Sequence, residues 1–142
     1  MRFEALSPRE ASIFACVCDT VVAPQPALPP VRETDAVEFL DRLLAASPRL
    51  NRAALRGLLY AAELAPRILG LGRRLRQLPE AERAGALRKL ERSPRLRELV
   101  RLVEGVAFLA YYGDDAIMRR LGYDADERVG RARELRAKEA RP

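Results

Sequence analysis

Three copies of the tripeptide Ser-Pro-Arg divide this chain into helical segments. Serine is a preferred N-cap because its hydroxyl accepts a hydrogen bond from a free N–H of the first turn. Proline suits the first helical position because its missing N–H would be unpaired there. The copies begin at Ser7, Ser47 and Ser93. They predict three helix starts, and Glu10 is placed to complete a capping box with Ser7.

Apolar residues recur every three or four positions after these starts, which is the spacing of one helix face. The dominant residues, Ala, Leu, Arg and Glu, lose little side-chain freedom in a helix. The sequence therefore predicts an all-α fold, a compact bundle of five to six helices, in residues 1–125. A charged tail, 126–142, is expected to be either a solvated helix or partly disordered. The expected helices span residues 8–22, 48–64, 79–91 and 94–112, with one more from near Thr34 or Asp35 and a short one from Asp114 or Asp115 to Leu121.

A proline-rich segment interrupts the helices after residue 22. Each proline lacks the backbone N–H that would donate a hydrogen bond, and it favours an extended backbone at the preceding residue. An ordered extended loop is therefore expected after the first helix, and its prolines are Pro24, Pro26, Pro29 and Pro30.

Two further placements follow from the helical spacing. Asp35 and Glu38 have the spacing of a second capping box. Arg49, Arg52, Arg56 and Glu63 fall opposite the apolar stripe of the third helix, so we expect these four side chains on its solvent-facing side.

The segment 94–112 has the most apolar pattern in the chain. Leu102, Phe108 and Leu109 widen its stripe until the second half is apolar nearly all round. Such a pattern is typical of a central helix that is covered on several sides. Glu104, inside this helix, is expected on its exposed edge; the alternative is a pair with an arginine in the core or in a partner.

Charge is unevenly distributed. The net charge is +6, but residues 1–48 carry −3, residues 49–101 carry +9 and residues 102–142 carry none. The middle segment could steer an acidic partner. An Arg-rich nucleic-acid-binding protein is therefore an alternative, and it predicts steeply salt-dependent binding. No recognition-helix motif accompanies these arginines.

Residues for catalysis are scarce. The chain has no histidine, the commonest general base and metal ligand. Cys16 and Cys18 lie two apart on a helix and point in different directions, so we expect ordinary buried thiols, with a bond to a partner chain as the alternative. Asp114 and Asp115 are interpreted as a helix cap rather than a cation site. We expect no enzyme activity, metal or cofactor in this chain.

Neither export nor membrane insertion is indicated. Glu4, Glu10 and Asp19 interrupt the first twenty residues, and no apolar stretch follows a basic start. The longest uncharged apolar run, 105–113, is far shorter than the ~20 residues of a membrane span. A cytoplasmic protein is expected.

Five segments in order resemble the gluconate 2-dehydrogenase subunit 3 family. Near the C-terminal end they are LAYYGDD at residues 109–115 and LGYD at 121–124, and earlier they are LSPRE at 6–10, CDTVVAP at 18–24 and VEFLD at 37–41. Together they cover roughly residues 5–125. The first two are similar to the family's tyrosine-rich turn and its Leu-Gly-Tyr-acid ending.

The resemblance implies a role rather than a reaction. Members are small non-catalytic subunits of flavin-dependent dehydrogenases of the glucose–methanol–choline class. They support the folding of the catalytic subunit, which binds FAD, and exported members carry a twin-arginine signal. This sequence shows no such signal, so the resemblance implies a cytoplasmic complex, or export only with a partner that carries the signal.

Two irregular segments are predicted to contact the partner, because ordered segments outside helix interiors suit recognition. Tyrosine is enriched in interface hot spots. The more usual role of residues such as Tyr111, Tyr112 and Tyr123 is to close the core at the end of a bundle. The predicted partner-binding residues are Pro24, Pro26, Pro29, Pro30, Tyr111, Tyr112, Asp114, Asp115 and Tyr123.

Overall fold

The computed structural model describes residues 3–23, 26–123 and 125–139, and the side chains of the last range from 127 to 136. These residues form helices and turns with no strand among them, which confirms the all-α prediction. The helices are α1 (Pro8–Val22), α2 (Ala36–Ala46), α3 (Arg49–Pro66), α4 (Glu80–Arg92), α5 (Arg97–Tyr112), α6 (Asp115–Arg120) and α7 (Ala125–Glu139). Short helical turns lie at Val31–Glu33, Arg67–Leu71 and Leu75–Gln77.

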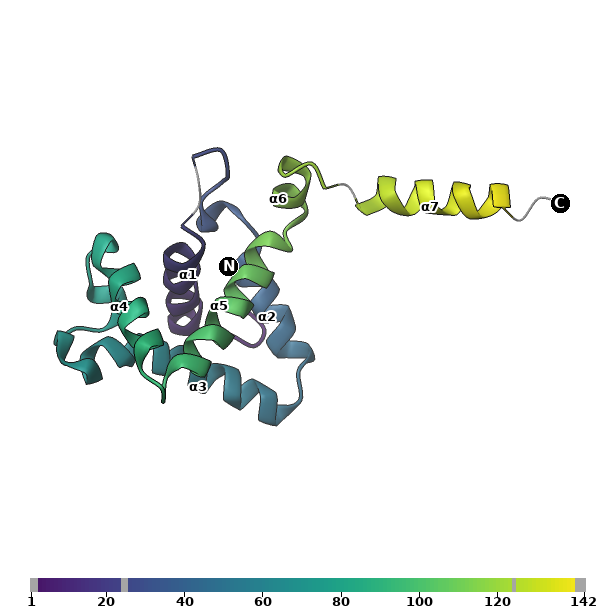
Figure 1. Ribbon diagram of the computed structural model, residues 1–142. Helices are drawn as coiled ribbons and strands as arrows, with labels where there is room; N and C mark the ends of the chain where they lie inside the picture. Colours follow the sequence, from purple (N-terminus) through teal and green to yellow (C-terminus); the bar gives the residue numbers. More distant parts are fainter. Residues whose placement is uncertain (1–2, 24–25, 124, 140–142) are drawn as a thin grey trace.

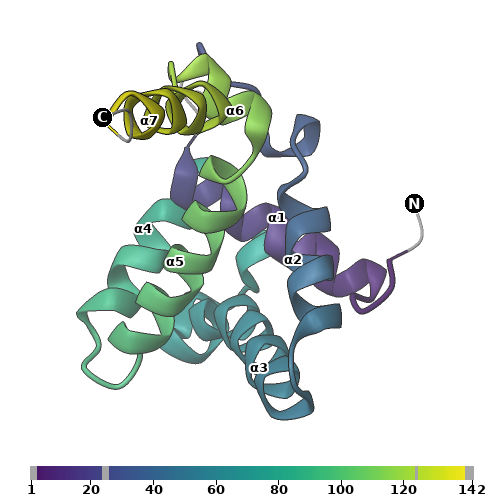
Figure 2. The same ribbon diagram turned by 90° about the vertical axis from the view of Figure 1, so that its right-hand side faces the viewer.

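Helix α5 lies at the centre of the bundle. It packs most extensively against α1 and also contacts α4, α2 and α3. Figure 2 shows α5 running between α4 and α2, with α1 behind it. The side chains with no exposed surface at this centre include Ile13, Phe14, Val17, Cys18, Leu44, Leu90 and Ala107. The core is thus built from the apolar stripes of all five larger helices of the bundle.

The start of α1 is capped as predicted. The Ser7 hydroxyl accepts from the Glu10 backbone N–H at 3.2 Å, and a Glu10 carboxylate oxygen accepts from the Ser7 N–H at 2.8 Å. Glu10 is buried, and its carboxylate also lies 3.4 Å from the Arg56 guanidinium. Arg56 in turn donates to the carbonyl of Ala5. The cap therefore ties the N-terminal segment to α3 as well as starting α1.

The other two serines do not cap a following helix with their side chains, although α3 begins at Arg49, directly after Ser47-Pro48, as predicted. Ser47 ends α2 and Ser93 ends α4. Residues 94–96 form a turn in which the Ser93 carbonyl accepts from the Leu96 and Arg97 N–H groups, so α5 begins only at Arg97. Proline cannot continue a helix, and a Ser-Pro pair therefore serves a helix end as well as a helix start.

The second capping box is also absent. Asp35 precedes α2 but makes no side-chain cap bond. Its backbone N–H instead donates to the Asp114 carboxylate at 2.9 Å. A contact 79 residues away in the sequence thus replaces the local one that the spacing predicted.

The N-terminal segment is held by one carboxylate of α2. The Asp41 oxygens accept from the backbone N–H groups of Glu4, Ala5 and Leu6 at 2.9, 2.9 and 2.8 Å. Burial alone would raise the pKa of Asp41, but these three donors outweigh it and leave the pKa below its ordinary value. Asp41 thereby fixes residues 4–6 against α2.

Glycine at position 113 is required by packing. A Cβ atom there would lie 2.5 Å from the Leu109 carbonyl oxygen, a backbone atom that cannot move aside. We expect Gly113→Ala to lower the free energy of unfolding by about 1–3 kcal/mol. Gly57→Ala is the matched control, because a Cβ at Gly57 meets nothing within 4 Å, and it should stabilise α3 by about 0.5–1 kcal/mol. Urea unfolding of both variants measures the contrast, and equal effects would contradict it.

Helix α7 projects away from the bundle (Figure 1). Its described side chains are almost all exposed, Val129 and Leu135 among them. The Arg128 guanidinium lies 4.8 Å from the centre of the Tyr123 ring, next to the start of the helix. Of the two alternatives for the tail, residues 125–139 adopt the solvated helix; residues 140–142 lie outside the described part of the chain.

Candidate partner-binding surface

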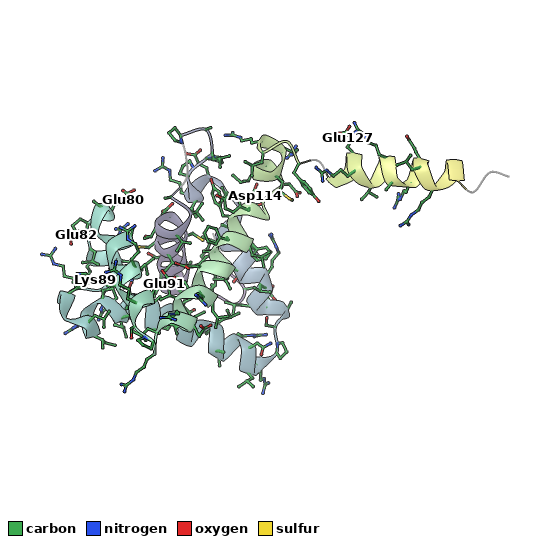
Figure 3. The ribbon with its side chains drawn as sticks, viewed as in Figure 1. Glu80, Glu82, Lys89, Glu91, Asp114 and Glu127 are labelled. Atoms are coloured by element: carbon green, nitrogen blue, oxygen red, sulfur yellow. The ribbon has the colours of Figure 1, made fainter. Side chains whose placement is uncertain are left out.

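The two segments predicted to contact a partner meet at one end of the bundle. The Tyr111 hydroxyl donates to the Pro29 carbonyl at 2.7 Å, which joins the end of α5 to the proline-rich loop. Asp114, labelled in Figure 3 at the junction of α5 and α6, accepts from the Asp35 N–H just after the loop. We call this region the loop–α6 end, made of residues 26–35 and 111–123.

The predicted residues divide into exposed and internal ones. Pro26, Asp115, Tyr112 and Tyr123 are exposed, the two tyrosine residues by 38% and 43% of their surface. Pro29, Pro30 and Asp114 are half-buried, and Tyr111 is fully buried. Pro24 lies outside the described residues.

Tyr111 holds the loop in place. Its ring has no exposed surface, and its hydroxyl is the group bonded to Pro29. Burial raises the pKa of this hydroxyl, with smaller contributions from Tyr112 and Asp114. The hydroxyl therefore stays protonated and donates the bond over the whole physiological pH range.

Asp114 acts as a helix cap, as predicted. One of its oxygens accepts from the N–H groups of Ala116 and Ile117 at 2.8 and 3.2 Å, and the other accepts from Asp35. Burial would raise the pKa of Asp114, but the three backbone donors outweigh it and lower the pKa. Its oxygens are thus used by the chain itself rather than directed toward a cation.

The lowered pKa values of Asp41 and Asp114 predict acid sensitivity. A carboxyl whose pKa is lower in the folded than in the unfolded chain stabilises the fold above its unfolded pKa, near 3.9. That stability is lost as the pH falls from about 4 through the lower, folded pKa values. We expect the midpoint of urea unfolding to drop over this range. Asp114→Asn and Asp41→Asn should each flatten the drop, whereas the exposed Glu82→Gln should leave it unchanged.

The middle of α5 exposes an apolar surface that the sequence did not predict. Leu102, Phe108, Leu109 and Tyr112 are exposed by 61, 43, 57 and 38%, and Gly105 lies among them. We call these five residues the α5 face. Helix α5 packs against α1, α2, α3 and α4, as expected of a central helix, but these contacts leave the α5 face exposed.

The rings of the α5 face are held in place before any partner arrives. Phe108 and Tyr112 stack with their ring centres 6.1 Å apart, and Tyr112 meets the buried Tyr111 edge-on at 5.1 Å. Contacts of this kind restrict the rotamers of the exposed rings. A partner that covers them would lose less side-chain entropy on binding.

Glu104 lies at the border of the α5 face. It is half-buried rather than on a fully exposed edge, which corrects the sequence prediction. Burial raises the pKa of its carboxyl, and the nearby charge of Glu91 raises it further.

Part of the arginine excess is internal to the fold. Arg52 donates to the carbonyls of Ala45 and Ser47, and Arg83 donates to the carbonyl of Leu78 at 3.0 Å. Arg52 and Arg56 are half-buried rather than in solvent, contrary to the prediction. These guanidinium groups bond the backbone and so are not free for a partner.

Glu63 departs furthest from the predicted exposure to solvent. It is only 1% exposed, and its carboxylate accepts from the Arg76 guanidinium at 3.0 Å and from the Arg76 backbone N–H at 3.3 Å. Arg76 also donates to the Ser12 hydroxyl at 3.0 Å. This buried pair links α3, the turn that contains Arg76, and α1.

Six exposed cations gather where α4 turns into α5. We call this region the basic corner; its residues are Arg88, Lys89, Arg92, Arg95, Arg97 and Arg101, all exposed. Figure 3 places Lys89 and Glu91 in this part of the molecule, well away from Asp114. Arg49, Arg67 and Arg73 are also exposed, so only part of the positive charge of residues 49–101 lies at this corner.

Two surface hollows flank the loop–α6 end. The larger, of about 730 Å³, lies between the loop and the start of α4, and its charged lining is balanced: Asp19, Arg32, Glu80 and Arg83. Burial raises the pKa of Asp19, and Glu80 adds to the rise. The smaller hollow, of about 390 Å³, lies between α2 and α6 and includes Asp114, Asp115 and Arg119. Both hollows border the predicted contact residues.

The two cysteines are buried thiols, as expected. Burial raises the pKa of Cys16, and it raises the pKa of Cys18 to about 12. The reactive thiolate form is therefore disfavoured at both positions. Within the described residues no group of three or more His, Cys, Asp or Glu side chains is arranged to hold a metal ion, and no helix there is long and apolar enough to cross a bilayer.

No family model matches the chain, and neither a curated protein nor a solved structure matches it. The family resemblance therefore rests on the sequence motifs alone.

Proposed function

We propose that this chain is a non-catalytic subunit that binds and stabilises a larger partner protein through the α5 face. One observation carries the proposal: the second half of α5 is apolar nearly all round, yet the chain leaves Leu102, Phe108, Leu109 and Tyr112 exposed. Contiguous exposed apolar side chains of this size mark interaction sites in many proteins. Preordered rings at the centre of the face, with polar and charged residues around it, match the anatomy of a protein interface.

A flavin-dependent dehydrogenase is the first partner to test. The order of the five motifs supports this choice, and FAD would be bound by the partner rather than by this chain. Binding only the folded partner would shift that protein toward its native state, by about 2.7 kcal/mol when the subunit is present at 100 times its dissociation constant. The loop–α6 end lies beside the α5 face and would extend the contact. A cytoplasmic complex is part of this proposal.

The test is a pull-down of the tagged chain from its native cells, with flavin absorbance measured in the eluate and its proteins identified. Leu109→Arg introduces a charge at the centre of the α5 face, whereas Leu50→Arg is a matched control at an exposed position on α3. We expect a flavoprotein to co-purify with the unaltered chain and with Leu50→Arg but not with Leu109→Arg. An eluate without flavin, or one unaffected by Leu109→Arg, would overturn the proposal.

A nucleic-acid-binding protein is the second candidate, and the basic corner favours it. Neutralised phosphates release counterions, so binding would weaken steeply with salt. The discriminating result is a flavin-free eluate rich in nucleic acid that is lost on raising the salt. Replacing Arg92 and Arg95 by Ala would then reduce the salt dependence, while Leu109→Arg would leave it unchanged.

A further inference from the structure

We propose that the α5 face also binds a second copy of this chain, so that the free protein forms a two-fold symmetric dimer with its α5 helices antiparallel. The dimer uses the face that the proposed function assigns to a partner, and it requires nothing but this chain. It would cover the exposed side chains until a partner displaces the second copy. The shape of the face, its flanking charges and its size all favour this dimer.

The α5 face is complementary to itself in shape. Leu102, Gly105, Leu109 and Tyr112 follow one another at intervals of three, four and three residues, which places them on one helical seam about 15 Å long. A Cβ at Gly105 would meet nothing within 4 Å, so the seam has an open notch there. With the two-fold axis level with Ala107, Leu109 of each copy lies over Gly105 of the other, and Leu102 faces Tyr112. A large residue then meets a small one near the centre of the interface, and two large side chains meet at each end.

The flanking charges favour the antiparallel orientation. Arg101 lies one residue before the seam, and Asp115 lies just beyond its other end; both are exposed. Antiparallel pairing brings Arg101 of each copy toward Asp115 of the other, whereas parallel pairing would place Arg101 beside Arg101. Within the chain, Arg101 forms an ion pair with the exposed Glu98 at 3.6 Å, and such a surface pair is easily exchanged.

The size of the α5 face determines how strongly the two copies are expected to bind. Its four large side chains expose on the order of 400 Å² per copy, about half of what each partner buries in a standard interface. We therefore expect a dimer with a roughly micromolar dissociation constant rather than an obligate one. A dimer of that strength can be displaced by a partner that covers a larger area.

The test is sedimentation of the purified full chain between about 1 and 200 µM, a range that spans a micromolar dissociation constant. We expect a monomer–dimer equilibrium in which Leu109→Arg is monomeric throughout. Gly105→Gln should fill the notch and weaken the dimer at least tenfold, whereas Gly57→Gln, at another open helical glycine, should leave it unchanged. Arg101→Asp and Asp115→Arg should each weaken the dimer, and their combination should restore it. Circular dichroism of each variant checks that the fold is retained.

The outcomes separate this inference from the proposed function. If the chain sediments as a monomer at all concentrations, the proposed dimer is overturned. If a dimer persists in Leu109→Arg, the chain dimerises through another surface and the inference is overturned as well. Because sedimentation is measured without any partner, loss of the flavoprotein from the pull-down overturns only the proposed function.

Discussion

Replacing Glu63 with Ala is expected to lower the free energy of unfolding by about 3 kcal/mol. Removing one member of a buried ion pair typically costs about 3–5 kcal/mol, because the other charge is left without a partner. The Arg76 side chain keeps 28% of its surface exposed and can regain water, which places the expected loss at the lower end of that range. The same substitution also leaves the Arg76 backbone N–H without its acceptor.

Urea unfolding followed by circular dichroism measures this effect, and a double-mutant cycle with Arg76→Ala isolates the pair. We expect the two single losses to exceed the loss in the double variant by at least 1 kcal/mol, the range found for residues in one network. Arg88→Ala, at an exposed position on α4, is the control and should change stability by less than about 0.5 kcal/mol. Strictly additive losses would show that the carboxylate and the guanidinium do not stabilise one another.

Tyr111→Ala is the second change with a large expected effect, about 3–5 kcal/mol of unfolding free energy. The buried ring fills space between α5 and the proline-rich loop, so its removal leaves a cavity. Tyr111→Phe keeps the ring and removes only the hydroxyl that donates to Pro29. It should cost about 1 kcal/mol, the usual net value of one hydrogen bond.

Thermal unfolding of both variants gives the two losses, and Tyr112→Phe is the control. Tyr112 is adjacent in sequence but exposed, so removing its hydroxyl should change stability by no more than about 0.5 kcal/mol. If Tyr111→Phe and Tyr112→Phe were equally mild, the bond to Pro29 would not be what holds the loop. A large loss of unfolding free energy in Tyr112→Phe would instead show that the Tyr112 hydroxyl stabilises the fold.

Local signals were sufficient where a helix depends on its own residues. Ser7 and Glu10 lie three apart, and their reciprocal bonds start α1 as predicted. Asp114 caps α6 through the two following N–H groups for the same reason. The helix start predicted after Ser47 was right to within one residue, whereas after Ser93 a turn delays the start of α5 to Arg97. Both serines also end the preceding helix, and only the neighbouring turns decide where the next helix begins.

Long-range partners account for the other errors. Glu63 is buried because Arg76 reaches it from a turn thirteen residues later, and helical spacing alone contains no information about that contact. Tyr111 and Tyr112 are identical neighbours, and the rotation of α5 buries one and exposes the other. The apolar pattern of α5 was recognised, but a single sequence cannot show whether its covering comes from the same chain.

The packing of α1 against α5 also determines when the chain can fold during synthesis. The Cys18 thiol meets the Ala107 carbonyl across 89 residues, so the first helix to be made acquires its main neighbour near the end of the bundle. At a synthesis rate of about 5–20 residues per second, that interval is roughly 4–18 s. For this time the apolar side of α1, with Phe14 at its centre, has only α2, α3 and α4 to cover it. The nascent chain therefore exposes its most hydrophobic surfaces in succession, first on α1 and finally on α5.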